Sequence, residues 1–246
     1  MKAVVLYSGG KDSTMAVYHA LKNGDEVYAL LTMVSRNKES YMFHVPDIHM
    51  VDYCSAAMEI PVIDVLTDGI KEEELGDLES LLIRMKDKDV EAVYTGALAS
   101  EYQRSRIEGI CEKLSLKCIS PMWHQDPVEY MNEIVDLGFE VIITSVAAYG
   151  LDKKWLGRKI TRETVDELVK LNKKYGIHPA FEGGEAETLV LDAPMYDRRI
   201  VVDEADVYWD VDSGIYNITK AHLEEKYDYS ITILNYNHIF LLDELW

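Results

Sequence analysis

The first feature that could carry chemistry is a run of small and charged residues near the N-terminus. The run consists of Ser8, Gly9, Gly10, Lys11, Asp12 and Ser13. Adjacent glycines let the backbone turn sharply and bring its N–H groups close to an anion. Lys11 adds a positive charge, and the serines add hydroxyl groups. The run predicts a phosphate site, although its spacing is not that of a Walker A loop. The alternative is a glycine turn in which Ser13 only caps a helix.

A second dense run places carboxylates around a Gly-Gly turn. Its candidate residues are Glu182, Gly183, Gly184, Glu185, Glu187, Thr188 and Asp192. Clustered carboxylates can hold a cation such as Mg²⁺ or ammonium, and they can accept a proton. The run therefore predicts an acidic pocket, and the alternative is a solvated acidic turn in front of a strand.

The elements around the first run follow the pattern of a covered parallel sheet. Short apolar segments alternate with helical ones, and this alternation is typical of strands joined by crossover helices. The predicted strands are 3–7, 26–33, 61–66, 92–94 and 117–120, and the predicted helices are 13–23, 46–58, 71–86 and 105–114. The first run then lies between a strand and a helix N-terminus, whose partial positive charge favours phosphate.

The second half of the chain is less regular. Helices are predicted at 127–137 and 161–175, and strands at 140–148, 189–192, 199–202 and 207–211. Thr161 is the expected N-cap of the second helix. A domain boundary is predicted near Pro121. The tail 230–246 contains apolar segments that we expect to pack on the body or on a partner.

Composition limits the possible classes of protein. The 246 residues include 48% hydrophobic residues, which argues against disorder. The 25 basic and 44 acidic residues give a net charge of −19, which argues against nonspecific nucleic-acid binding. Apolar runs are too short to span a membrane, and the N-terminus does not read as a secretion signal. The three cysteines lack CxxC spacing, so we expect a reduced, cytoplasmic protein without a structural disulfide or zinc site.

The first run resembles the PP-loop of the N-type ATP pyrophosphatases. This resemblance implies an α/β fold with a Rossmann-like parallel sheet of the adenine nucleotide alpha hydrolase type, and a smaller C-terminal α/β domain. It also implies that ATP is cleaved between its α and β phosphates, releasing AMP and pyrophosphate. Residues 1–121 would form the ATP-binding domain, and residues 122–246 would form the substrate-binding and catalytic domain.

The second run resembles the signature of the diphthine–ammonia ligase (diphthamide synthase) family. Further similar stretches are 41–44, 95–96, 102–104 and 156–158, and the resemblance extends to about residue 226. Members of this family amidate diphthine, a modified histidine of translation elongation factor 2, with ammonium and ATP. The run departs from the pattern at Ala186, where relatives commonly carry an aromatic residue.

The resemblance implies roles for individual residues. The nucleotide-binding residues would be Ser8, Gly9, Gly10, Lys11, Asp12, Ser13, His44, Thr95 and Gly96. The substrate-binding residues would be Tyr102, Gln103, Arg104, Arg158, Gly183, Gly184 and Thr188, and the catalytic residues would be Lys11, Glu182, Glu185, Glu187 and Asp192. The expected cofactors are ATP and Mg²⁺, and no metal ligand is assigned.

The expected partners follow from the same resemblance. They are diphthine-bearing elongation factor 2 and ammonium, without direct nucleic-acid or membrane binding, while homo-oligomer formation stays open. An acidic pocket with aromatic neighbours would suit the quaternary ammonium of diphthine. Two alternatives also stay open: another PP-loop enzyme such as an RNA-modifying ligase, and a non-catalytic ATP-sensing module. The first would need a basic RNA-binding face, and the second would leave the acidic run unexplained.

Overall fold

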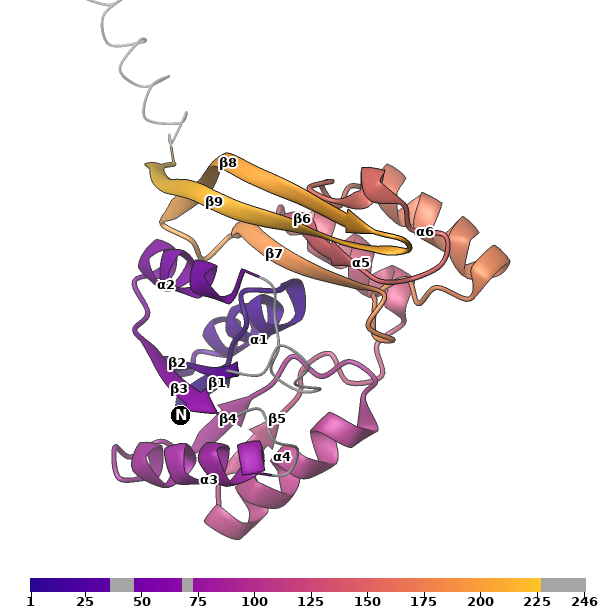
Figure 1. Ribbon diagram of the computed structural model, residues 1–246. Coiled ribbons are helices and arrows are strands. Elements are labelled where there is room, and N and C mark those ends of the chain that lie inside the picture. Colours follow the sequence, from indigo (N-terminus) through magenta and orange to yellow (C-terminus); the bar gives the residue numbers. More distant parts are fainter. Residues whose placement is uncertain (36–46, 68–72, 227–246) are drawn as a thin grey trace, which may run out of the picture.

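The computed structural model describes residues 1–35, 47–67 and 73–226 of the chain. Within these residues the chain forms a five-stranded sheet and a four-stranded sheet, with helices between them and around them (Figure 1). The predicted α/β fold class is confirmed. The stretch 41–44, including His44, and the tail 230–246 lie outside the described residues.

The first sheet is parallel throughout and has the strand order β3-β2-β1-β4-β5. Its strands are β1 (Lys2–Leu6), β2 (Glu26–Ser35), β3 (Val62–Thr67), β4 (Ala92–Tyr94) and β5 (Lys117–Ile119). Strands β2 and β3 lie on one side of β1, and strands β4 and β5, which follow them in the chain, lie on its other side. The strand order therefore reverses between β1 and β4. Open α/β sheets bind ligands at the carboxyl ends of strands beside such a reversal.

Helices cover both faces of this sheet because its strands are apolar on both faces. The helices are α1 (Lys11–Lys22), α2 (Val51–Met58), α3 (Glu73–Lys86) and α4 (Glu101–Leu114). Ala3, Val5 and Tyr7 pack in one core cluster with α1 and α2, while Val4 packs in the other with α3 and α4. This alternation is the two-residue period of a strand buried on both sides.

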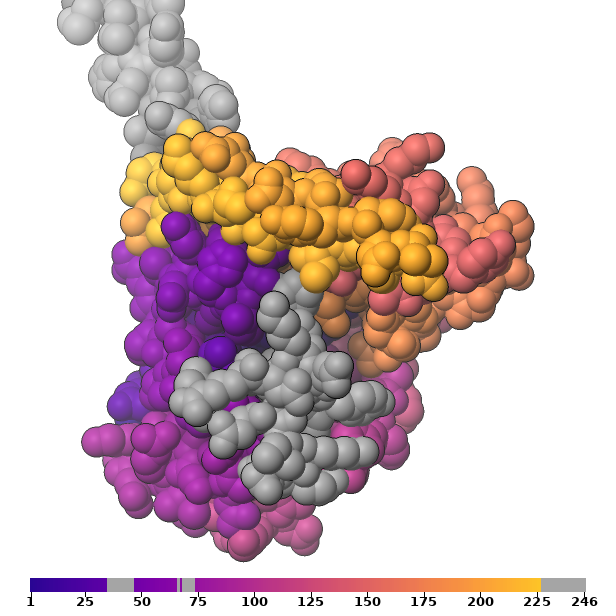
Figure 2. Space-filling view, in the orientation of Figure 1, coloured from indigo at the N-terminus to yellow at the C-terminus, as the bar shows by residue number. Residues whose placement is uncertain are grey.

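The second sheet is antiparallel and has the order β7-β6-β9-β8. Its strands are β6 (Glu140–Val146), β7 (Ala186–Asp192), β8 (Arg198–Asp210) and β9 (Ser213–Glu225), and the accompanying helices are α5 (Pro127–Asp136) and α6 (Arg162–Tyr175). Two short 3₁₀ turns are η1 (Ile48–Met50) and η2 (Lys153–Trp155). β7 contacts α1, and β8 contacts α2. Figure 2 shows β8 and β9, orange to yellow, spread across the N-terminal elements in indigo and violet.

The structure corrects the predicted strands of this sheet. The two strands predicted at 199–202 and 207–211 are one strand, β8, and β7 begins at Ala186 within the acidic run. Strand β9 was not predicted. It pairs with β8 over almost its whole length, with irregular register near Glu204, and many of its side chains are exposed. A strand that buries few side chains lacks a clear two-residue apolar pattern.

The predicted N-cap of α6 is confirmed, because the Thr161 side chain accepts a hydrogen bond from the Thr164 backbone N–H. Among the helices in the described part of the chain, none is both long enough and apolar enough to cross a bilayer.

Candidate active site

The run from Ser8 to Ser13 lies at the reversal point of the first sheet, between β1 and α1. Gly9 has a φ of +82°, in the left-handed region that favours glycine. Gly10 is the N-cap of α1. This conformation turns the chain from the strand into the helix within a few residues, and it places the N-terminus of α1 at the carboxyl edge of the sheet.

Strand β7 of the second sheet lies directly on this loop. The Val190 N–H donates to the carbonyl oxygen of Gly9 at 3.0 Å. The Lys11 N–H donates to Thr188 Oγ1 at 3.2 Å, and Thr188 is buried. These contacts join residues that are far apart in the sequence. The run from Ser8 to Ser13 and the acidic run therefore meet in one candidate site.

Lys11 is almost fully buried, with 3% of its surface exposed. Its Nζ lies 2.8 Å from Asp12 Oδ2, and Asp12 Oδ1 accepts a hydrogen bond of 2.7 Å from the Tyr130 hydroxyl. Burial raises the pKa of Tyr130 well above its ordinary value, so the hydroxyl stays neutral and donates. Lys11 is buried, whereas Asp12 is 29% exposed. Because removing a lysine ammonium from water costs free energy, its burial at this loop points to a functional role.

The end of β4 forms another wall of the site. A Cβ atom on Gly96 would lie 2.7 Å from the Asp12 carbonyl carbon and 2.8 Å from the Ser13 nitrogen. Thr95 Oγ1 lies 2.9 Å from Ser120 Oγ at the end of β5. Only glycine lets the β4 end pack this closely against the loop.

Replacement of Gly96 by alanine should therefore displace the loop. Because the clash is with backbone atoms, we expect the free energy of unfolding to fall by about 1–3 kcal/mol, and ATP binding to weaken as well. Gly109→Ala is the matched control. No atom lies within 4 Å of a Cβ at Gly109 in α4, so alanine there should stabilise the helix by roughly 0.5–1 kcal/mol. Thermal unfolding and ATP titration of both variants test this, and equal stability of the two would contradict it.

Two carboxylates of the acidic run hold loops in place. Glu182 Oε2 accepts a hydrogen bond of 2.9 Å from the Ala99 N–H. Glu185 accepts hydrogen bonds from the N–H groups of His178 at 2.8 Å and Gly183 at 2.9 Å. Burial is the main cause that raises the pKa of Glu182. These contacts fix the Gly-Gly turn against the loop that follows β4.

Glu187 has different surroundings from these two residues. Burial raises its pKa to about 7, the nearby charge of Lys11 lowers it in part, and Asp12 and Glu182 raise it further. Among the described residues, no hydrogen bond or ion pair engages its carboxylate. A carboxylate with such a pKa can exchange a proton near neutral pH. Glu187 is therefore the member of the acidic run best suited to act as a base.

Comparison with known proteins identifies the family of the chain. The model of the diphthamide synthase N-terminal domain matches residues 1–118, and that of the diphthamide synthase C-terminal domain matches residues 126–223. The chain belongs to the diphthamide synthase family. The resemblance proposed from the sequence is confirmed.

Relatives in this family are named diphthine–ammonia ligases. The mouse protein is 33% identical over 251 residues, which cover 92% of this chain and 94% of the relative. The human protein is 32% identical over 227 residues, covering 84% and 85%. The Schizosaccharomyces pombe protein is 36% identical over 224 residues, covering 84% of this chain. The chain spans only 37% of that longer relative.

A solved structure from Methanocaldococcus jannaschii, described as a predicted subunit of tRNA methyltransferase, is a weaker match. It has a TM-score of 0.41 and 15% identity, over 79% of this chain and 98% of that one. This similarity is too loose to support an argument about function.

Asp192 and Arg158, which were expected in the site, make no contact with residues 8–13 through a hydrogen bond or an ion pair in the described part of the chain. Asp192 follows Glu187 by five residues on β7, roughly 17 Å along the strand, and it pairs with Lys226. Arg158 pairs with Glu167 at 2.6 Å.

The remaining expected substrate residues lie in the first turn of α4. Ser100 caps this helix by accepting a hydrogen bond from the Gln103 N–H. The Arg104 guanidinium pairs with Glu108 at 2.6 Å, and it lies 4.3 Å from the centre of the Trp123 ring. Tyr102 lies on the same turn. These residues follow the β4 end in the chain and therefore lie on the ligand-binding side of the sheet.

Tyr130 and Trp123 were not predicted as site residues from the sequence. Tyr130 is one of several apolar residues on the buried face of α5, so its pattern is that of an ordinary core position. Trp123 lies in an irregular segment between β5 and α5. Neither residue carries a local signal, because each acquires its contact with a site residue through the fold.

Proposed function

We propose that this protein is an AMP-forming diphthine–ammonia ligase. The proposal depends on the contact of β7 with residues 8–13, which we call the phosphate-binding loop. This contact brings Lys11 and the carboxylate of Glu187 into one site. The names of the family relatives support the same activity. The substrates are ATP, ammonium and the diphthine residue of translation elongation factor 2.

The loop residues bind the phosphates of ATP. Lys11, the hydroxyls of Ser8 and Ser13, and the N-terminus of α1 offer positive charge and donors on one side. Mg²⁺ prefers phosphate and carboxylate oxygens. Asp12, whose two oxygens contact Lys11 Nζ and the Tyr130 hydroxyl, is the loop carboxylate that would help to hold the ion. When bound, the ion offsets the negative charge of the phosphates.

Amidation then takes place in two steps. In the first step, a carboxylate oxygen of diphthine attacks the α-phosphorus of ATP. The bond from this phosphorus to the oxygen that bridges the α- and β-phosphates breaks. Pyrophosphate departs, and the product is an acyl-adenylate. Ammonium gives a proton to Glu187, and the resulting ammonia attacks the acyl carbon. The bond from the acyl carbon to the AMP oxygen breaks, AMP leaves, and the nitrogen gives a second proton to solvent to form the amide. The buried Lys11 charge stabilises the first step, in which negative charge moves to the departing pyrophosphate.

The test is a product assay. The full chain is incubated with ATP, Mg²⁺, ammonium and elongation factor 2 that carries diphthine. We expect AMP and pyrophosphate, and a decrease in the mass of the factor that matches replacement of a hydroxyl by an amino group. Formation of ADP would exclude this mechanism. RNA-dependent release of AMP would favour an RNA-modifying ligase, and tight ATP binding without turnover would favour a sensing module.

Three further assignments belong to this proposal. Residues 1–121 serve as the ATP-binding domain, and residues 122–246 serve as the substrate-binding domain. The nitrogen comes from free ammonium. The protein works in the cytoplasm, where elongation factor 2 is found.

A further inference from the structure

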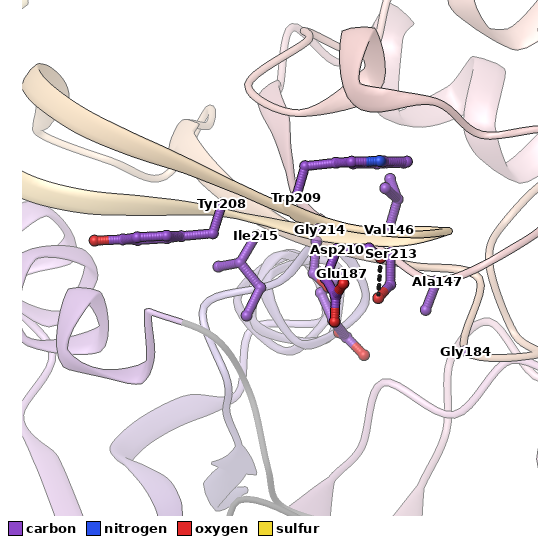
Figure 3. A pocket seen from close by; sticks show the side chains of 11 residues that line it. Val146, Ala147, Gly184, Glu187, Tyr208, Trp209, Asp210, Ser213, Gly214 and Ile215 are labelled. Carbon is purple, nitrogen blue, oxygen red and sulfur yellow. Dashed lines mark hydrogen bonds between the residues drawn. The ribbon is translucent and has the colours of Figure 1, made fainter.

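A cavity of about 590 Å³ opens beside the acidic run (Figure 3). Its lining includes Gly184 and Glu187 from the acidic run, and Tyr208, Asp210 and Ile215 from the β8–β9 hairpin. Cavities of this size commonly hold small ligands or side chains. Because Glu187 lines the cavity and also interacts electrostatically with Lys11, the cavity adjoins the phosphate-binding loop.

The register of the second sheet explains which side chains face the cavity. Glu187 pairs with Ser145, Ser145 pairs with Ile215, and Ile215 pairs with Tyr208. Directly paired residues lie on the same face of a sheet, so these four form one row across all four strands. Asp210 follows Tyr208 by two residues on β8 and shares its face.

The neighbouring row faces the opposite side. It contains Ala186, Val146, Gly214 and Trp209, and the Trp209 ring packs beside Gly214. Figure 3 shows Trp209 and Val146 on one side of the strands and Glu187, Asp210 and Ile215 on the other. Val146, Gly214 and Trp209 of this second row also border the cavity, so the first row differs from it by the Glu187 carboxylate and the Tyr208 ring.

The cavity face combines an aromatic ring with negative charge. Tyr208 is 59% exposed, and its hydroxyl lies 3.5 Å from Asp206 Oδ2. In the part of the chain that the structure describes, neither the Glu187 carboxylate nor the Asp210 carboxylate is engaged by a hydrogen bond or an ion pair. A quaternary ammonium carries a positive charge but has no N–H to donate. It is therefore bound by an aromatic face and nearby negative charge rather than by directed hydrogen bonds.

We propose that this cavity binds the quaternary ammonium group of diphthine against the carboxylates of Asp210 and Glu187, with the Tyr208 ring at the edge of the site. The inference rests on the proposed function and extends it to the recognition of the substrate side chain. In diphthine the quaternary ammonium and the reacting carboxylate are attached to the same carbon. A cation held beside Glu187 therefore brings that carboxylate to the edge of the phosphate-binding loop.

The experiment measures the KM for diphthine-bearing elongation factor 2 at saturating ATP and ammonium. Tyr208→Ala and Asp210→Asn should each raise this KM roughly five- to tenfold, while the KM for ATP stays unchanged. Tyr208→Phe keeps the ring and should retain the wild-type KM. Tetramethylammonium should inhibit the wild type competitively against the factor, and it should inhibit Tyr208→Ala much less.

Matched controls come from surface residues of the same kind. Tyr149→Ala removes a ring that is 81% exposed, and Asp212→Asn removes a charge from the β8–β9 turn without lining the cavity. Both should leave the KM for the factor unchanged. An active wild type whose KM is unaffected by Tyr208→Ala and Asp210→Asn would overturn this inference and leave the proposed function intact. A wild type that forms no AMP would overturn the proposed function and this inference with it.

Discussion

Replacement of Lys11 by methionine is expected to lower kcat/KM for AMP formation by about a hundred- to a thousandfold, the typical loss when one preorganised charge-stabilising group is removed. Lys11 Nζ is buried at the N-terminus of α1. Water cannot readily replace it there, and methionine fills its volume without charge. Steady-state release of AMP and pyrophosphate measures the loss.

Lys22→Met is the control for this change. Lys22 lies in the last turn of the same helix and is exposed, so its loss should leave turnover unchanged. Thermal unfolding of both variants shows whether the fold persists. If Lys11→Met, correctly folded, kept turnover within a few-fold of the wild type, the phosphate-binding role of the loop would be refuted.

Replacement of Glu187 by glutamine should stabilise the protein at alkaline pH while impairing amide formation. Burial raises the pKa of Glu187 from 4.5 to about 7 in the folded protein. Between these values the folded state binds more protons than the unfolded state, so stability falls as pH rises through this window. The ionised carboxylate therefore costs roughly 3 kcal/mol above pH 7, and glutamine removes this cost.

The same variant should lose the base that takes a proton from ammonium. A positioned base typically contributes about a hundred- to ten-thousandfold, so we expect a loss of that order in amide formation. The rise of wild-type activity through about pH 7 should disappear. Exchange of pyrophosphate into ATP should continue, because adenylation precedes the proton transfer.

Glu129→Gln controls for loss of a carboxylate, since Glu129 is exposed on α5. Denaturant unfolding at pH 5 and pH 8, together with mass analysis of the factor, tests both parts of the prediction. An unchanged rate of amide formation in Glu187→Gln would assign the proton acceptor to another group. If Glu187→Gln and the wild type had the same free energy of unfolding at pH 8, the predicted cost of ionising buried Glu187 would be contradicted.

The first sheet could be predicted from the sequence because its signals are local. Each strand is a short apolar run buried on both faces, and each helix has its own periodicity and caps. The run from Ser8 to Ser13 predicted a phosphate site for the same reason, since glycines, a lysine and a helix start are all adjacent in the chain. The position of Gly96 beside this run was also predicted, because ligands of open parallel sheets bind at the carboxyl ends of the strands and Gly96 follows such an end.

The second sheet was harder to predict because its strands depend on pairing over long distances. Strand β9 is stabilised by backbone pairing with β8 and buries few side chains. Its sequence therefore resembles a polar connection. The cavity face formed by Glu187, Ile215 and Tyr208 depends on the register of four strands, and register is fixed only when the sheet assembles.

The sequence by itself determined the chemical groups of this protein: a glycine-lysine loop for phosphate and a carboxylate-rich run. Only the tertiary structure decided what each group can do. Glu182 and Glu185 are held by N–H groups of other segments, Asp192 lies at the far end of β7, and Glu187 is buried without a partner among the described residues. Burial and hydrogen bonding set the proton affinity of a carboxylate, and both arise from residues distant in the chain.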